Sequence, residues 1–249
     1  MTNGETRQPA RAEDGTPTEK SSEYRLARLA REDWPLWAMF ALACGVAAWI
    51  FGSLPERVPV HWNVHGQVDG WGSRTMGSFG LLGVFAGVYV LAALAPLIDP
   101  RRANYAKFLP TFRLIRWALV IVFLCIWAAA LSAARGVPVR IDKVVPIVIA
   151  LLFVVLGNVM GRLRQNWFVG IRTPWSLSSE EAWRLTHRVS GRAWVVGGLI
   201  CLAGALVGGD VAGITMLVTI LGMAGFSVVY SYFAYRRCER EASQHADGA

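Results

Sequence analysis

Hydrophobic residues in this 249-residue chain gather into six long stretches that contain no charged side chain. Each stretch is about as long as a helix that crosses a bilayer, which needs about 17–25 residues. They are residues 34–55, 75–98, 117–134, 144–161, 193–209 and 211–235. The residues Gly208, Gly209 and Asp210 divide the last two into a tight hairpin. The pattern predicts an all-α, polytopic membrane protein with six transmembrane helices.

The composition agrees with this class of protein. The chain is 54% hydrophobic and 17% charged, whereas soluble domains carry about 25% charged residues. The net charge of +8 would fit a nucleic-acid-binding protein only if the basic residues shared one surface. Instead, 20 of the 25 Lys and Arg residues fall in segments on one predicted side of the membrane. Topology explains the charge, and we expect no direct contact with nucleic acid.

The same asymmetry predicts the orientation. Basic residues mark the cytoplasmic side of a membrane protein, so both termini and the segment 157–191 should be cytoplasmic and the loop 54–74 extracytoplasmic. Residues 1–33 form a cytoplasmic tail, disordered at first and an amphipathic basic helix over 25–33. Residues 34–98 hold the first two spans, 114–235 the other four, and 236–249 a second cytoplasmic tail. The four cysteines are scattered and predict neither disulfides nor a cofactor site.

The polar segment 157–191 is richer in Trp, Arg, Asn and His than a plain helix connection requires. Ser178 and Glu181 have the spacing of a capping box, so a short helix should run from near Ser179 to about Val189. Trp183 and His187 would then share one face. The candidate site residues of this segment are Asn158, Arg164, Asn166, Trp167, Arg172, Thr173, Pro174, Trp175, Trp183, Thr186 and His187.

Arg172 is the strongest candidate for binding in this segment. Pro174 favours an extended Thr173 and keeps residues 170–175 out of the helix. A guanidinium on such a backbone could pair with a lipid phosphate or with the carboxylate of a partner. The alternative is structural, with the arginines and tryptophans tying the loop to head groups and helix ends.

The loop 54–74 contains prolines and glycines that exclude a long helix and favour an ordered loop or two short strands. Its candidate residues are Pro59, His61, Trp62, Asn63, Gly66, Asp69 and Gly70. Two His and an Asp could bind a divalent metal. Outside a helix, however, the spacing of His61 and His65 does not bring them together. We therefore predict a hydrogen-bonded outer cap without metal.

Two other functions are compatible with the class. A transporter or channel needs polar groups inside the spans, but Asn158 is the strongly polar residue of the fourth span and the six stretches carry no charge. An enzyme acting on a lipid or peptide could use His61, His65 and Asp69, yet the chain has neither GxSxG nor HExxH. We therefore expect a non-enzymatic protein.

Two segments together identify a family. GNVMGRLRQNWFVGIRTPWSLSSEEAWRLTHRVSG closely resembles the hallmark segment of the SdpI family, and LPERVPVHWNVHGQVDGWGSR resembles a short extracytoplasmic motif of the same proteins. The resemblance implies an immunity or signalling protein of the bacterial plasma membrane. It also implies the partners: membrane lipids, a membrane-active peptide toxin and, in the founding system, a small repressor held at the membrane.

Overall fold

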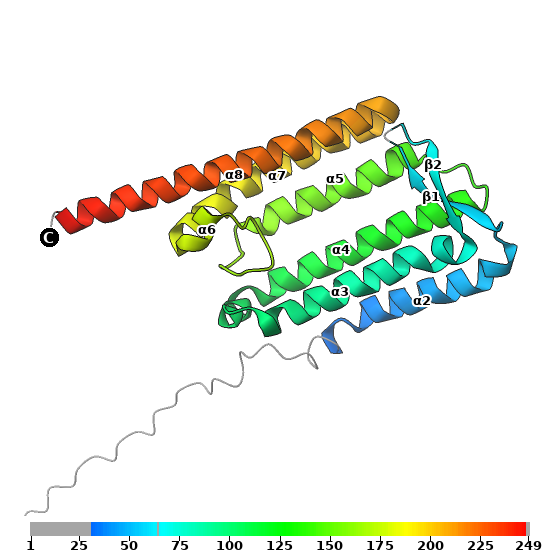
Figure 1. The fold of residues 1–249 in the computed structure, drawn as a ribbon, viewed down its shortest axis with the longest axis horizontal. Coiled ribbons are helices and arrows are strands. Elements are labelled where there is room, and N and C mark those ends of the chain that lie inside the picture. Colours follow the sequence, from blue (N-terminus) through cyan, green and yellow to red (C-terminus); the bar gives the residue numbers. More distant parts are fainter. Residues whose placement is uncertain (1–30, 64, 248–249) are drawn as a thin grey trace, which may run out of the picture.

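The computed structural model describes residues 31–63 and 65–247. Within them, six helices are long and apolar enough to cross a membrane, which confirms the predicted class. They lie side by side in one elongated bundle (Figure 1). Their bounds are α2 Trp34–Ile50, α3 Leu81–Ile98, α4 Tyr105–Ala134, α5 Ile141–Met160, α7 Glu180–Val207 and α8 Gly209–Asp247.

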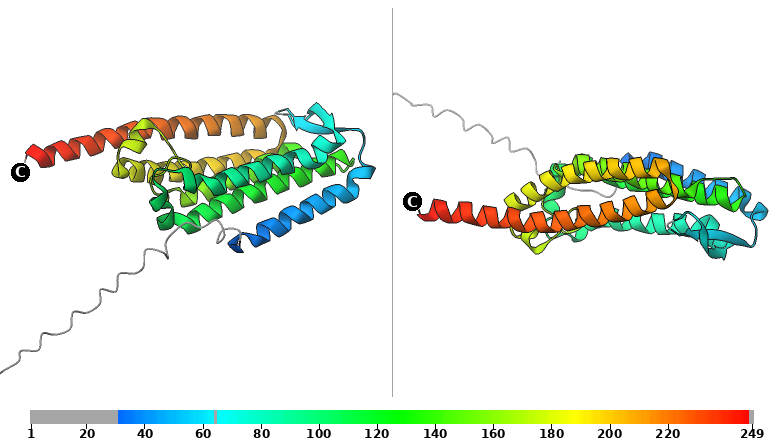
Figure 2. Two further views of the ribbon diagram at one scale, coloured as in Figure 1. Left: turned by 60° about the horizontal axis from the view of Figure 1, so that its bottom comes forward. Right: turned by 90° about the horizontal axis from the view of Figure 1, so that it is seen from above.

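A two-stranded β-hairpin covers one end of the bundle (Figures 1 and 2). Its strands are β1 Arg57–Trp62 and β2 Val68–Ser73, paired antiparallel with irregular register around His61. Of the two alternatives that the sequence left open, an ordered loop or two short strands, the structure has the strands. We call this the hairpin end, and the opposite end, where α2 begins and α8 runs past the bundle, the terminal end.

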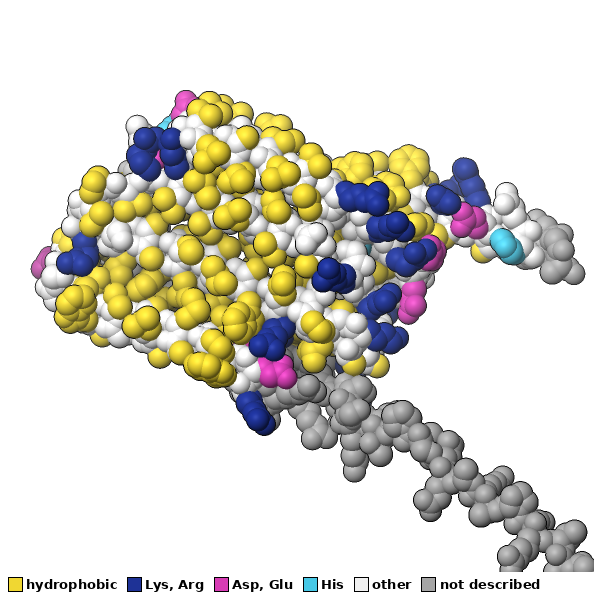
Figure 3. Space-filling model, turned by 180° about the vertical axis from the view of Figure 1, so that it is seen from behind, with side chains coloured by type: hydrophobic (Ala, Val, Ile, Leu, Met, Phe, Trp, Pro, Cys, Tyr) yellow, Lys and Arg dark blue, Asp and Glu magenta, His cyan; other side chains and the backbone are white. Residues whose placement is uncertain are grey.

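Side-chain chemistry follows the long axis of the bundle. Hydrophobic side chains cover its middle, while Lys and Arg gather at the terminal end and in smaller groups at the hairpin end (Figure 3). Leu91 of α3 and Leu217 of α8 are 70% and 57% exposed. In water such exposure would be costly, but in a bilayer these side chains meet lipid tails.

The third span begins earlier than predicted. The sequence placed this span at residues 117–134, yet a short helix at Arg102–Asn104 leads into α4 at Tyr105. Tyr105, Phe108, Phe112 and Ile115 recur at helical spacing and are buried in one cluster, so their packing outweighs the charges. The helix accommodates Pro110 by departing from helical geometry at Phe108 (φ −134°, ψ 22°).

The short helix expected near Ser179 is not separate, because α7 continues from Glu180 through the fifth span. Ser179 caps it by accepting a hydrogen bond from the Ala182 backbone N–H. A different short helix, α6 Pro174–Ser178, precedes it, so residues 174 and 175 are helical, contrary to prediction. The polar tail 236–249 was also expected to be separate, but α8 continues to Asp247.

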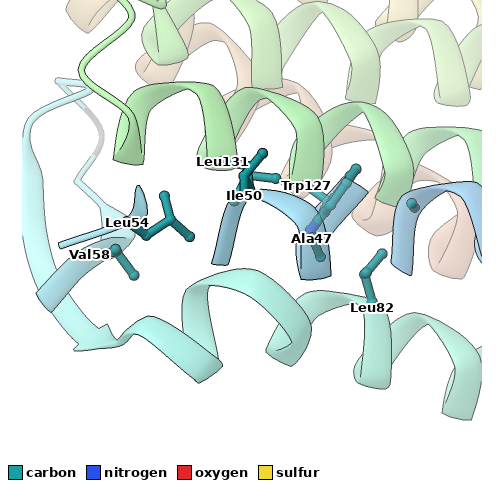
Figure 4. Packing of buried hydrophobic residues seen from close by; sticks show 8 residues of the cluster. Ala47, Ile50, Leu54, Val58, Leu82, Trp127 and Leu131 are labelled. Carbon is teal, nitrogen blue, oxygen red and sulfur yellow. The ribbon is translucent and has the colours of Figure 1, made fainter. Parts of the chain in front are cut away.

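The two halves of the bundle pack differently. In the first half, the residues of α2, β1, α3 and α4 that Figure 4 labels bury large side chains around Trp127. In the second half, α5 and α7 touch through glycines. A Cβ on Gly157 would lie 2.6 Å from the carbonyl oxygen of Gly191, and the reverse also holds, so only glycine permits this approach. Among the described residues, Gly83 and Gly87 in α3 have no atom within 4 Å of their Cβ positions, so α3 makes no comparable close approach there.

A buried ion pair fixes the start of α2. The Asp33 carboxylate accepts hydrogen bonds from Arg116 Nη2 (2.9 Å), Tyr89 Oη (2.6 Å) and Trp117 Nε1 (2.8 Å). Burial raises the pKa of Asp33, but these bonds outweigh it and hold the pKa below its usual value. The amphipathic helix predicted over 25–33 lies largely outside the described residues, and its last residue, Asp33, points inward.

Candidate functional site

Asn166 organises the loop that connects α5 to α6, residues 161–173, which we call the α5–α6 loop. Its side chain is fully buried. The Oδ1 atom accepts hydrogen bonds from the backbone N–H groups of Phe168 (2.9 Å) and Val169 (2.7 Å), and Nδ2 donates to the carbonyl oxygens of Arg164 (2.8 Å) and Val169 (3.0 Å). One amide thus satisfies four backbone groups that an irregular loop would leave unpaired.

Asp99, at the end of α3, ties this loop to the first half of the bundle. Its carboxylate accepts hydrogen bonds from the Trp167 backbone N–H (2.9 Å) and the Tyr105 hydroxyl (2.9 Å). Asp99 is 2% exposed and Tyr105 is fully buried. Sequence reasoning missed both residues, because an aspartate next to a basic segment gives no sign of a partner 68 positions away.

His187 holds the other side of the loop. The Ile171 backbone N–H donates to Nε2 (2.9 Å), so the ring proton lies on Nδ1, which donates to the Trp183 carbonyl (2.8 Å). The ring stacks on Trp183 at 3.9 Å between centroids, as the predicted shared face requires. Gly170 has φ +115°, and a Cβ there would collide with His187 Nε2. With both nitrogens used and no exposure, His187 is not available for acid–base chemistry.

Thr173 completes the anchoring at the start of α6. It is extended, as Pro174 predicts, and forms a capping box with Ser176. Its hydroxyl also donates to Ser231 Oγ in α8 (2.8 Å). Ser231 is a third residue that the sequence did not single out. Trp175 packs edge-on against Tyr232, so α6 is fastened to α8 by both polar and aromatic contacts.

The remaining candidates of this segment divide into exposed and buried residues. Arg164, Arg172 and Trp167 are exposed on the α5–α6 loop, and Arg172 Nη1 donates to the Trp167 carbonyl (2.7 Å). Thr186 is buried in α7. Asn158 is exposed on α5, apart from the buried network. The segment thus presents two arginines and a tryptophan on the surface of a loop that buried hydrogen-bonding side chains hold.

The polar residues of the β-hairpin form two separate pairs. His61 Nδ1 lies 2.6 Å from the Asp69 carboxylate across the strands, and His65 pairs with Asp210 at the α7–α8 turn. Asn63 Oδ1 accepts the backbone N–H groups of His65 and Gln67. Within residues 31–63 and 65–247, no group of three or more His, Cys, Asp or Glu side chains is placed to hold a metal ion.

The other hairpin candidates shape this end of the molecule. Pro59 is buried and Trp62 is half-buried. Gly70 permits close strand pairing, because a Cβ there would lie 2.7 Å from His61 Cβ. Gly66 has φ +76° and sits against Asp142 of α5. The β-hairpin therefore contacts both halves of the bundle.

Comparison with known proteins supports the resemblance seen in the sequence. Residues 162–231 match the model of the SdpI/YfhL protein family, and residues 38–86 match that of a domain of unknown function (DUF1648). The chain is 25% identical over 188 residues to the immunity protein SdpI of Bacillus subtilis (strain 168), covering 76% of this chain and 88% of that protein. No solved structure matches. The resemblance to the SdpI family is confirmed.

Proposed function

We propose that this SdpI-like membrane protein is an immunity protein that protects a bacterial cell against a membrane-active peptide toxin. One observation carries the proposal: the matched family region, residues 162–231, contains nearly all of the α5–α6 loop and its anchors Thr173, Trp183 and His187. This frame holds Arg164, Trp167 and Arg172 at the surface. An arginine beside a tryptophan suits an anionic head group or a partner carboxylate.

The orientation belongs to the proposal. The basic residues of the terminal end support an orientation in the bacterial plasma membrane with the α5–α6 loop and both termini in the cytoplasm and the β-hairpin outside. The test uses a variant whose four cysteines are replaced by serine and which carries one new cysteine, Ser73→Cys or Ser178→Cys. A membrane-impermeant maleimide should label intact cells at position 73 only. Labelling of both positions from outside would contradict this topology.

Arg172 provides the test of function. Cells sensitive to a membrane-active peptide toxin would express the wild type, Arg172→Ala or Arg172→Lys, with Arg188→Ala as a control on the exposed part of α7. Loss of a charge-assisted contact costs about 1.5–3 kcal/mol, which weakens a complex about tenfold to a hundredfold. Lysine cannot reproduce the planar fork, so both Arg172 variants should lose protection while Arg188→Ala keeps it.

Membrane levels of every variant are measured by immunoblot, so that a folding defect is not mistaken for a loss of function. If both Arg172 variants protect fully at equal abundance, the loop is a structural connector. A repressor partner, as in the founding system of the family, would bind the same face. Co-purification of a small DNA-binding protein with wild type but not with Arg172→Ala would support that part of the proposal.

A further inference from the structure

A cavity of about 530 Å³ lies at the hairpin end, beneath β1 and between the two halves of the bundle. Its volume falls in the range of about 300–1,000 Å³ that is usual for ligand sites. Four spanning helices form its wall, and the β-hairpin forms its roof with His61 and Asn63. The wall residues are Val84, Ile126, Ala130, Val145, Leu217 and Ile220.

The apolar side chains of the wall argue against water, and against empty space, as the content of the cavity. Water in a protein cavity needs two to four polar partners, and the wall below His61 and Asn63 is made of aliphatic side chains. An empty space of this size would leave the wall without dispersion contacts. The cavity therefore fits an apolar ligand.

The cavity opens toward the lipid-facing surface. Val84 of α3 and Leu217 of α8 lie at its open side and are 52% and 57% exposed. A bilayer chain can thus enter sideways, between α3 and α8. The polar groups lie together at the hairpin end, where Asp142 is neutralised by a bidentate pair with Arg140 (2.9 and 2.7 Å).

We propose that the cavity binds one acyl chain of a bilayer phospholipid, with its head group at the level of His61 and Asn63. The apolar wall accepts the chain, and the ring and amide at the roof meet the polar part. The bound chain fills the gap between the halves. This site is independent of the proposed immunity function, because it requires neither a toxin nor the α5–α6 loop.

Photolabelling tests the proposal. The protein is reconstituted in vesicles of phosphatidylethanolamine and phosphatidylglycerol that contain a phospholipid with a diazirine at the end of one chain. After irradiation, labelled positions are mapped by mass spectrometry. We expect stronger labelling at Ala130 and Met216, which line the cavity, than at Leu91 and Val218, which are 70% and 63% exposed. Labelling that only follows exposure would overturn the proposal.

Filling the cavity provides the matched comparison. Ala130→Trp in α4 and Val84→Trp in α3 each place a large ring in the cavity, whereas Leu91→Trp places the same ring on α3 outside it. Both cavity variants should lose the labelling at Met216, and Leu91→Trp should keep it. The two cavity variants lie on different helices, so the test does not depend on the folding of one of them. Size-exclusion chromatography shows whether each variant is folded.

Unchanged labelling at Met216 in folded cavity variants would overturn the proposal. A second arm uses a membrane-active peptide that carries a photoreactive leucine. If this peptide labels the cavity and the phospholipid does not, the occupant is a peptide and the lipid site is wrong. Loss of protection by Arg172→Ala with intact lipid labelling would show that the two proposals are separate.

Discussion

The α5–α6 loop and the β-hairpin both concentrate polar and aromatic residues at a membrane boundary, but they use them in opposite ways. In the loop region, Asn166 and His187 have no exposed surface and Thr173 is 8% exposed. In the hairpin, the side chains of His61 and Asp69 are 71% and 42% exposed. The loop residues are buried side chains that satisfy backbone groups of an irregular segment, where an unpaired group is costly. The hairpin residues form surface pairs that water and salt weaken.

The largest effect is expected for Asn166→Ala. The substitution leaves four part-buried backbone groups without their partner and should lower the free energy of unfolding by about 3–4 kcal/mol. Titration of the purified protein with sodium dodecyl sulfate in mixed micelles measures this loss. A loss below about 1 kcal/mol would mean that the loop is no better anchored than the hairpin.

Two glycine-to-alanine variants separate the energetic cost of backbone strain from that of a steric collision. Gly170→Ala combines a left-handed backbone (φ +115°) with a collision against His187, whereas Gly136→Ala has φ +78° and open space. Gly136→Ala should lower the free energy of unfolding by about 1–2 kcal/mol from backbone strain alone. Gly170→Ala should lower it by about 1–3 kcal/mol more, because of the collision. Equal losses in the same titration would show that His187 does not fix the position of the loop.

The smallest effect is expected in the hairpin. His61→Ala removes a surface pair, which contributes about 0–1 kcal/mol. The free energy of unfolding should therefore change by less than about 1 kcal/mol. A loss as large as that of Asn166→Ala would contradict the contrast between the two regions.

The parts that the sequence predicted are those governed by local spacing. Apolar length predicted the spans, prolines and glycines predicted the strands, and a four-residue interval placed Trp183 against His187. The partners that lie far away in the sequence escaped prediction. Asp33 and Arg116 are 83 positions apart, and Asp99 meets Trp167 only in the folded bundle. A charged residue near the end of a span gives the same topological signal whether it is buried or solvated.

The extent of α7 has a mechanical consequence. At a rise of about 1.5 Å per residue, its 28 residues form a rod about 42 Å long. At one end, Trp183 and His187 form hydrogen bonds with the backbone of the α5–α6 loop. The other end leads into the turn next to Asp210, which pairs with His65 of the hairpin. Because α7 is one continuous helix, it has no internal break at which a displacement of one end could be absorbed. A displacement of the end of α7 near Val207 therefore tilts or slides the whole helix, and with it Trp183, His187 and the loop backbone that they bind.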